Sequence, residues 1–169
     1  NDVADAAESL IGINGVEDGR VRISVSRGVL PGVAVTRPPA ATVLIQAHET
    51  QLAPPGRTEP IVLALSDHRV CPSSRTAGLK SLSYQANLLA LAVGRKRGAT
   101  EVLLQNSDGQ LAEGAMSNIF FVRDDKVCTP DVKCGLLPGV ARGTVFELCR
   151  DMGLVVHEGF FDPCDLWAA

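Results

Sequence analysis

The pattern of hydrophobic and polar positions divides the chain into alternating helical and extended segments. Apolar residues recur at helical spacing over three segments, which predicts helices at 2–12, 83–97 and 140–152. Period-two alternation or short β-branched runs predict strands at 21–27, 41–49, 61–67, 101–105, 110–122, 126–128 and 154–161. A further helix is expected to begin at Asp162 or Asp165.

Two of these segments carry more detailed expectations. The helix over 83–97 is apolar on most sides, so we expect it to be largely buried. The strand over 110–122 is expected to carry a break at Glu113 and Gly114. Proline-rich stretches at 36–40 and 53–60 cannot continue a helix or a central strand, and they predict loops.

Helices and strands intermix without strict βαβ alternation, which predicts a mixed α/β fold. A chain of 169 residues suffices for one buried core, so we expect a single domain over residues 1–169. The chain starts at Asn1 rather than at a methionine, and it stops inside an expected helix. We therefore expect it to be a piece of a longer protein, truncated at both ends.

The net charge, the hydrophobic pattern and the cysteine content argue against several classes of function. The net charge is only −3 and the basic residues are scattered, which argues against a nucleic-acid-binding protein. No apolar run is long enough to cross a membrane and no signal peptide is apparent, so we expect no membrane partner. Five widely spaced cysteines form no Cys-x-x-Cys pair or zinc spacing, so we expect free thiols, a cytoplasmic location and no metal site.

Lys80 is the first candidate for chemistry. It follows Gly78 and Leu79, just before the apolar helix, where a loop can direct its amine into a cleft. An amine at such a place can form a Schiff base with an aldehyde when its surroundings lower its pKa. The ordinary alternative is a solvated surface lysine, which is the commoner case.

Glu113 and the stretch LLPGVARG at 136–143 are the other candidates. Glu113 lies between apolar neighbours, so it either faces water at a sheet edge or pairs with a cationic group such as a protonated ring nitrogen. In LLPGVARG, the helix start at Val140 and Ala141 offers free main-chain N–H groups, which suit a phosphate. A plain helix start is the alternative there.

Several enzyme classes lack their signatures in this chain. The glycine-rich dinucleotide fingerprint, the phosphate P-loop, the zinc-protease helix and the nucleophile elbow of serine hydrolases do not occur. The three histidines, His48, His68 and His157, lie in or at the ends of expected strands. No serine or cysteine is visibly paired with any of them.

Taken in order, several stretches resemble the class IV (fold-type IV) pyridoxal-phosphate aminotransferases. These stretches are GLKSLSYQANLLA, GATEVLL, DGQLAEGAMSNIFFV, CTP, LLPGVARG and the strand ending in HEG. The family includes branched-chain aminotransferases, D-amino-acid transaminases and 4-amino-4-deoxychorismate lyases. The resemblance runs from about Val21 to the C-terminus, and it implies the large, cofactor-binding domain of that fold.

The resemblance implies a role for each matching residue. Lys80 matches the lysine that forms the Schiff base with pyridoxal phosphate and then moves the substrate proton. Glu113 matches the carboxylate that pairs with the pyridine nitrogen, and Tyr84 matches a tyrosine that hydrogen-bonds the ring hydroxyl in some members. Val140 and Ala141 match the positions whose N–H groups hold the phosphate. Ser117 and Asn118 match a polar pair beside the site, to which the sequence assigns no task.

Departures from the family pattern also matter. The family often has Thr at the position of Ala141, so here only the backbone bond to the phosphate would remain. The N-terminal small domain and a C-terminal phosphate-gripping loop are expected to lie outside this chain. The stretch VSRG at 25–28 is not followed by the Arg-x-His pair of D-amino-acid transaminases, which argues against that specificity.

Three functions follow as expectations from the resemblance. The first is an aminotransferase that exchanges an amino group between an amino acid and a 2-oxo acid, acting as a homodimer. The second is a 4-amino-4-deoxychorismate lyase, which releases pyruvate from the same cofactor site. The third is a truncated, non-catalytic domain that keeps the fold for binding or assembly.

Overall fold

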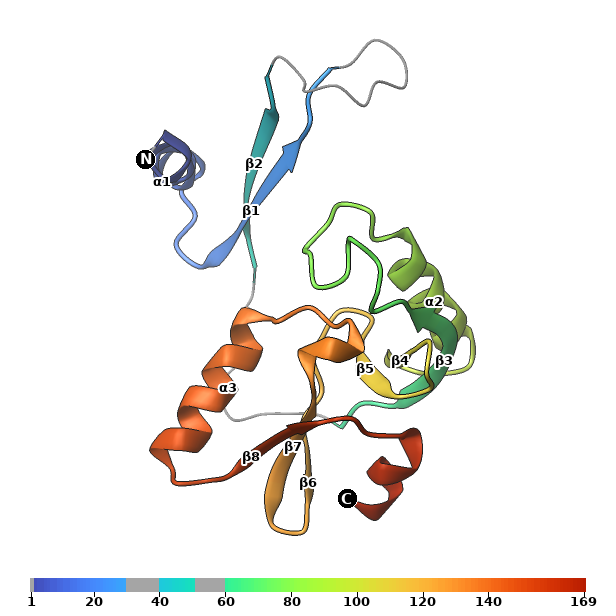
Figure 1. The fold of residues 1–169 in the computed structure, drawn as a ribbon. Coiled ribbons are helices and arrows are strands. Elements are labelled where there is room, and N and C mark those ends of the chain that lie inside the picture. The colour runs from blue at the N-terminus through green and yellow to red at the C-terminus, as the bar shows by residue number, and fades with distance from the viewer. Residues whose placement is uncertain (1, 30–39, 51–59) are drawn as a thin grey trace. The chain divides into compact units, whose positions relative to one another are not determined.

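The structure, a computed structural model, describes residues 2–29, 40–50 and 60–169 (Figure 1). The chain forms two compact units, Asn1–Glu59 and Pro60–Ala169, which are described separately. The loops predicted at 36–40 and 53–60 lie, except for Ala40 and Pro60, outside the described residues. The single domain expected over residues 1–169 stays a prediction.

The first unit is a helix packed on a two-stranded ribbon. Helix α1 (Asp2–Asn14) packs on strand β2 (Thr42–Glu49), which pairs antiparallel with β1 (Gly19–Ser26). Gly15, at a φ of +61°, follows the helix in the left-handed conformation that glycine adopts without strain. The helix and both strands confirm the elements predicted from the hydrophobic pattern.

The second unit begins with a three-stranded sheet (Figure 1). Strands β3 (Leu63–Val70) and β4 (Glu101–Asn106) are parallel, and β5 (Leu111–Gly114) runs antiparallel to β4. Helix α2 (Gln85–Lys96) connects the parallel strands and packs on both of them. Gly94 permits this packing, because a Cβ there would lie 2.2 Å from Val102 Cγ1. The core under the helix consists of Ala90, Leu91, Val102, Leu104 and Ala115.

A second three-stranded sheet completes this unit. Strand β7 (Lys126–Pro130) pairs antiparallel with β6 (Phe121–Arg123) and parallel with β8 (Val156–Gly159). Helix α3 (Val140–Asp151) connects β7 to β8, after a 3-10 turn, η1 (Val132–Cys134). Buried Arg142 anchors α3, since its Nη2 donates to Pro130 O at 3.0 Å and to Glu158 Oε1 at 2.7 Å. The last element, η2 (Pro163–Ala168), is a 3-10 helix.

Three sequence predictions about this unit need correction. The segment 110–122 is not one strand: it pairs with β4 as far as Gly114, turns, and enters the second sheet at Phe121. Strand 154–161 is shorter, spanning only β8. Helix α2 is not largely buried, because Leu88 and Leu89 are 51% and 60% exposed. Apolar side chains on several sides of a helix do not require that the fold covers all of them.

Other expectations can be compared with the described residues. All five cysteines are free thiols, as predicted; Cys128, Cys134 and Cys149 are buried, and Cys71 and Cys164 are exposed. Within residues 2–29, 40–50 and 60–169, no three metal-binding side chains converge on one point. No helix in that part of the chain is long and apolar enough to cross a membrane.

The packing of β4 predicts the effect of a core truncation. Leu104 is fully buried against α2, so Leu104→Ala should lower the free energy of unfolding by about 3 kcal/mol, through lost burial and the cavity left behind. The matched control, Leu88→Ala, removes the same atoms from a half-exposed position and should cost less than about 1 kcal/mol. Urea unfolding of both variants measures the difference. Equal losses would contradict this assignment of the core.

Candidate functional site

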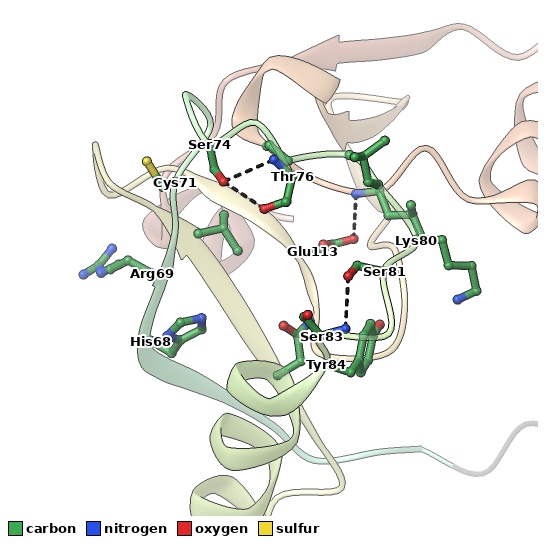
Figure 2. Close-up of a pocket in the computed structure, with 17 residues that line it drawn as sticks. His68, Arg69, Cys71, Ser74, Thr76, Lys80, Ser81, Ser83, Tyr84 and Glu113 are labelled. Carbon is green, nitrogen blue, oxygen red and sulfur yellow. Dashed lines mark hydrogen bonds between the residues drawn. The ribbon is translucent and has the colours of Figure 1, made fainter. Parts of the chain in front are cut away.

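The loop from Cys71 to Tyr84 carries Lys80 from the end of β3 to the start of α2. Successive turns shape it, with Ser74 N donating to Cys71 O and Ala77 N donating to Ser74 O, both at 3.0 Å. Gly78 has a φ of +70°, and a Cβ there would lie 3.6 Å from Leu136 O. The Lys80 side chain is exposed, and it extends away from Glu113 in Figure 2. Its Nζ lies 5.9 Å from the centre of the Tyr84 ring.

Glu113 belongs to strand β5, where its neighbours Ala112 and Gly114 are buried. Its carboxylate Oε2 accepts one hydrogen bond, from the backbone N–H of Leu137 at 3.0 Å. The other oxygen, Oε1, has no hydrogen bond to any residue that the structure describes. Burial raises the pKa of Glu113 to about 7, and the Leu137 N–H and the positive charge of Lys80 only partly offset this effect.

Tyr84 is the residue immediately before α2, and it lies beside both of these groups. Its ring is partly buried, and this burial is the main reason that the pKa of its hydroxyl is raised. The negative charges of Glu113 and Glu101 raise that pKa further. The Tyr84 hydroxyl therefore stays protonated at neutral pH and remains available as a hydrogen-bond donor.

One cavity of about 350 Å³ joins these groups (Figure 2). Three segments that are distant in sequence line it: the end of β3 with the loop after it, the start of α2, and the pair formed by Glu113 and Leu137. Three predicted site residues thus meet in one hollow: Lys80, Tyr84 and Glu113.

Val140 and Ala141 do not line this cavity, although the sequence analysis placed them in the same site. They form the first turn of α3, where both are exposed, Val140 to 90%. The first backbone bond of the helix runs from Gly143 N to Gly139 O at 3.1 Å, and no side chain caps the helix. Their N–H groups are therefore open to solvent, three and four residues beyond Leu137, which does line the cavity.

Leu137 and His68 line the cavity, although the sequence indicated neither as a site residue. Leu137 acts through its backbone N–H, and neither composition nor hydrophobic pattern can indicate that contact. His68 lies at an irregular stretch of β3, where the pairing with β4 shifts register and His68 N bonds to Ser66 Oγ at 3.0 Å. Such irregularities redirect side chains, so a strand-end histidine can reach a site that its sequence position does not reveal.

Chemically, the cavity combines an accessible amine, a protonated phenol and a half-buried carboxyl group, one oxygen of which has no hydrogen bond within the described part of the chain. The amine can react with a carbonyl group, and the carboxylate can pair with a cationic nitrogen. The neighbouring helix start offers N–H groups to an anion.

Comparisons with known proteins show what this chain is similar to. The aminodeoxychorismate lyase of Bacillus subtilis (strain 168) is 29% identical over 168 residues, covering 96% of this chain and 56% of the lyase. The structure of the branched-chain aminotransferase of Thermoproteus uzoniensis with norvaline matches 99% of this chain and 57% of that enzyme, at a TM-score of 0.90 and 26% identity.

A third similar protein is the branched-chain amino acid aminotransferase of Thermobaculum terrenum, solved in its PLP form. It matches 96% of this chain at a TM-score of 0.83 and 26% identity, and 54% of its own chain is covered. This chain therefore spans little more than half the length of these relatives. The family model for amino-transferase class IV matches residues 1–169. The chain belongs to the class IV aminotransferase family.

Proposed function

We propose that this chain supplies the cofactor-binding part of a pyridoxal-phosphate-dependent aminotransferase, which moves an amino group between an amino acid and a 2-oxo acid. The observation that carries the proposal is the convergence of Lys80, Tyr84 and Glu113 on one cavity. These residues come from a loop, a helix start and a strand, so the fold rather than sequence proximity brings them together.

The residues of the cavity fit pyridoxal phosphate. Glu113 Oε1, free of bonds within the described chain, can accept from a protonated ring nitrogen, and Tyr84 can donate to the ring hydroxyl. The first turn of α3 can hold the phosphate through the N–H groups of Val140 and Ala141. When bound, the cofactor supplies an electron sink for negative charge at the substrate α-carbon.

Lys80 would be the catalytic residue. Lys80 is exposed and lines the cavity. In this proposal its amine would hold the cofactor aldehyde and, once a substrate amine has taken its place, move the proton at the substrate α-carbon. Glu113 supports this role only as an anion, because a neutral carboxyl cannot stabilise a ring cation. A cationic partner at Oε1 would lower its pKa and keep it ionised at neutral pH.

A second candidate is a 4-amino-4-deoxychorismate lyase, which releases pyruvate. The match to the Bacillus subtilis lyase along 96% of this chain supports it. A non-catalytic domain is the third possibility, because this chain spans little more than half the length of the enzymes that it resembles. We further propose a cytoplasmic homodimer on the basis of the family resemblance; a monomeric mass of the full-length protein in sedimentation would contradict the dimer.

The role of Lys80 predicts where the cofactor attaches. Incubation of the full-length protein with pyridoxal phosphate, followed by borohydride reduction and peptide mapping, should place the phosphopyridoxyl group on Lys80. Lys80→Ala should abolish this labelling and the visible absorbance of the bound cofactor. Lys96→Ala, at the far end of α2, should leave both unchanged. Labelling lost in both variants or in neither would mean that another lysine is the attachment site.

The raised pKa of Glu113 predicts how stability of the cofactor-free protein depends on pH. The folded state holds this proton up to about pH 7, whereas the unfolded chain releases it near its usual value of 4.5. The free energy of unfolding should therefore fall as pH rises between these values. Glu113→Gln has no proton to release and still accepts the Leu137 N–H, so it should be more stable than the wild type at pH 8 by on the order of 2 kcal/mol.

Urea unfolding at pH 5 and pH 8 measures this effect. The matched control is Glu147→Gln, an exposed glutamate on α3 that does not line the cavity. Its pH dependence should follow that of the wild type. An unchanged pH dependence in Glu113→Gln would show that Glu113 is not held in the cavity as described.

The two catalytic candidates make opposite predictions about acceptor requirement. An aminotransferase should convert an amino acid only when a 2-oxo acid is present, because the amino group must be passed on. A lyase should release pyruvate from aminodeoxychorismate without an added acceptor. A coupled pyruvate assay with and without 2-oxoglutarate separates them, and acceptor-independent pyruvate release would overturn the aminotransferase proposal.

A further inference from the structure

Asn118 follows the turn after β5, five residues beyond Glu113, and its side chain lies against the segment Leu137–Gly139. Its Nδ2 donates to Leu137 O at 2.9 Å. A Cβ added to Gly139 would lie only 2.4 Å from Asn118 Oδ1, so the amide fits closely over that glycine. The side chain thus touches both ends of a three-residue segment.

The segment Leu137–Gly139 connects two parts of the candidate site, the Glu113 carboxylate and the start of α3. The Leu137 N–H donates to Glu113 Oε2 at 3.0 Å, and Gly139 is the residue immediately before α3. The two backbone polar groups of Leu137 are therefore held by two side chains five positions apart, its N–H by Glu113 and its carbonyl by Asn118. Pro138, between Leu137 and Gly139, has a restricted φ angle. A shift of Leu137 would therefore also move the start of α3.

The turn that carries Asn118 is itself fixed. Gly114 N donates to Ser117 O at 2.6 Å, which closes the turn. Met116 N and Ser117 Oγ both donate to Glu101 Oε2 at 3.2 Å, and Asn87 Nδ2 donates to Ala115 O at 3.0 Å. Contacts to β4 and α2 therefore hold the turn, and Asn118 extends from a rigid base.

We propose that Asn118 is a positioning residue that holds the Leu137–Gly139 segment so that the Glu113 carboxylate and the N-terminus of α3 keep a fixed separation. A ligand with a cationic ring nitrogen at one end and a phosphate at the other would need both ends at once. This inference rests on the proposed function for the identity of that ligand. The bracing of Leu137 stands on the contacts within the chain.

The first test uses the cofactor-free, full-length protein. Asn118→Ala removes the bond to Leu137 O, and Asn118→Leu does so while nearly keeping the side-chain volume. In both, the Leu137 N–H should hold Glu113 less well, so the pKa of Glu113, followed by ¹³C NMR of its carboxyl carbon, should rise by about half a unit or more. Ser117→Ala loses one of the two hydrogen bonds to Glu101 Oε2, but the bonds from Met116 N and Asn87 still hold the turn, so that pKa should be unchanged.

The second test compares ligand affinities. Both Asn118 variants should bind pyridoxal phosphate about tenfold more weakly than the wild type. The affinity for pyridoxal should fall less, because pyridoxal lacks the phosphate and does not need the Glu113 carboxylate and the start of α3 at the same time. Gly139→Ala should also weaken binding, because its methyl meets the Asn118 amide. In the double variant Asn118→Ala/Gly139→Ala the amide is gone and the methyl group has room. The losses of affinity from the two substitutions should therefore not be additive.

Each outcome has a definite meaning. The proposed role of Asn118 is supported if the pKa of Glu113 rises in the Asn118 variants and not in Ser117→Ala, and if the losses of affinity in the double variant are not additive. Any of three results would overturn this role: an unchanged pKa of Glu113 in the Asn118 variants, an equal rise of that pKa in Ser117→Ala, or strictly additive losses of affinity in the double variant. If the wild type bound no pyridoxal phosphate, the proposed function would fail, whereas the pKa comparison would still decide whether Asn118 braces Leu137.

Discussion

The site depends on how one carboxyl group is buried. Glu113 lies in a short strand beside Ala112, a core residue, and it receives a single hydrogen bond from the residues that the structure describes. Burial without a second partner disfavours the charge, so the pKa of the group lies near 7. A cationic partner at this carboxyl group would stabilise its ionised form. The proposed function rests on such a partner, and the Leu137 N–H holds the carboxylate in place.

In the second unit, the features of the site lie near the place where the two sheets join. Strand β5 belongs to the first sheet, and the chain then turns at residues 115–118 into the second. A shared cluster of Leu103, Leu111, Cys128 and Phe161 packs the sheets together, and Leu111 N donates to Phe161 O at 2.7 Å. The connection from β7 to α3 returns across this junction, which places Leu137 beside Glu113.

Much of this architecture could be predicted from the sequence, for identifiable reasons. Strand β4 is a short apolar run between a glycine stop and a turn, and all its residues are at least partly buried. The motif LLPGVARG marks the start of α3 because proline and glycine favour that boundary. Lys80 and Glu113 were candidates from their positions in the chain, Tyr84 came from the resemblance to the family, and all three line the cavity.

What could not be predicted has a common cause. The exposure of α2 depends on what the fold packs against it, and the pattern of apolar residues does not contain that information. The Leu137 N–H is a backbone group, so no residue type indicates its role. Asn118 was recognised as part of a polar pair, but its task depends on Leu137 and Gly139, which are about twenty positions away. Contacts between distant backbone segments become visible only in the folded chain.

The most direct measurement is a crystal structure of the full-length protein with pyridoxal phosphate. The account predicts continuous density between Lys80 Nζ and the cofactor, Glu113 Oε1 within hydrogen-bond distance of the ring nitrogen, and the phosphate at the first turn of α3. A cofactor bound elsewhere, or one joined to another lysine with Glu113 still facing only Leu137, would contradict it.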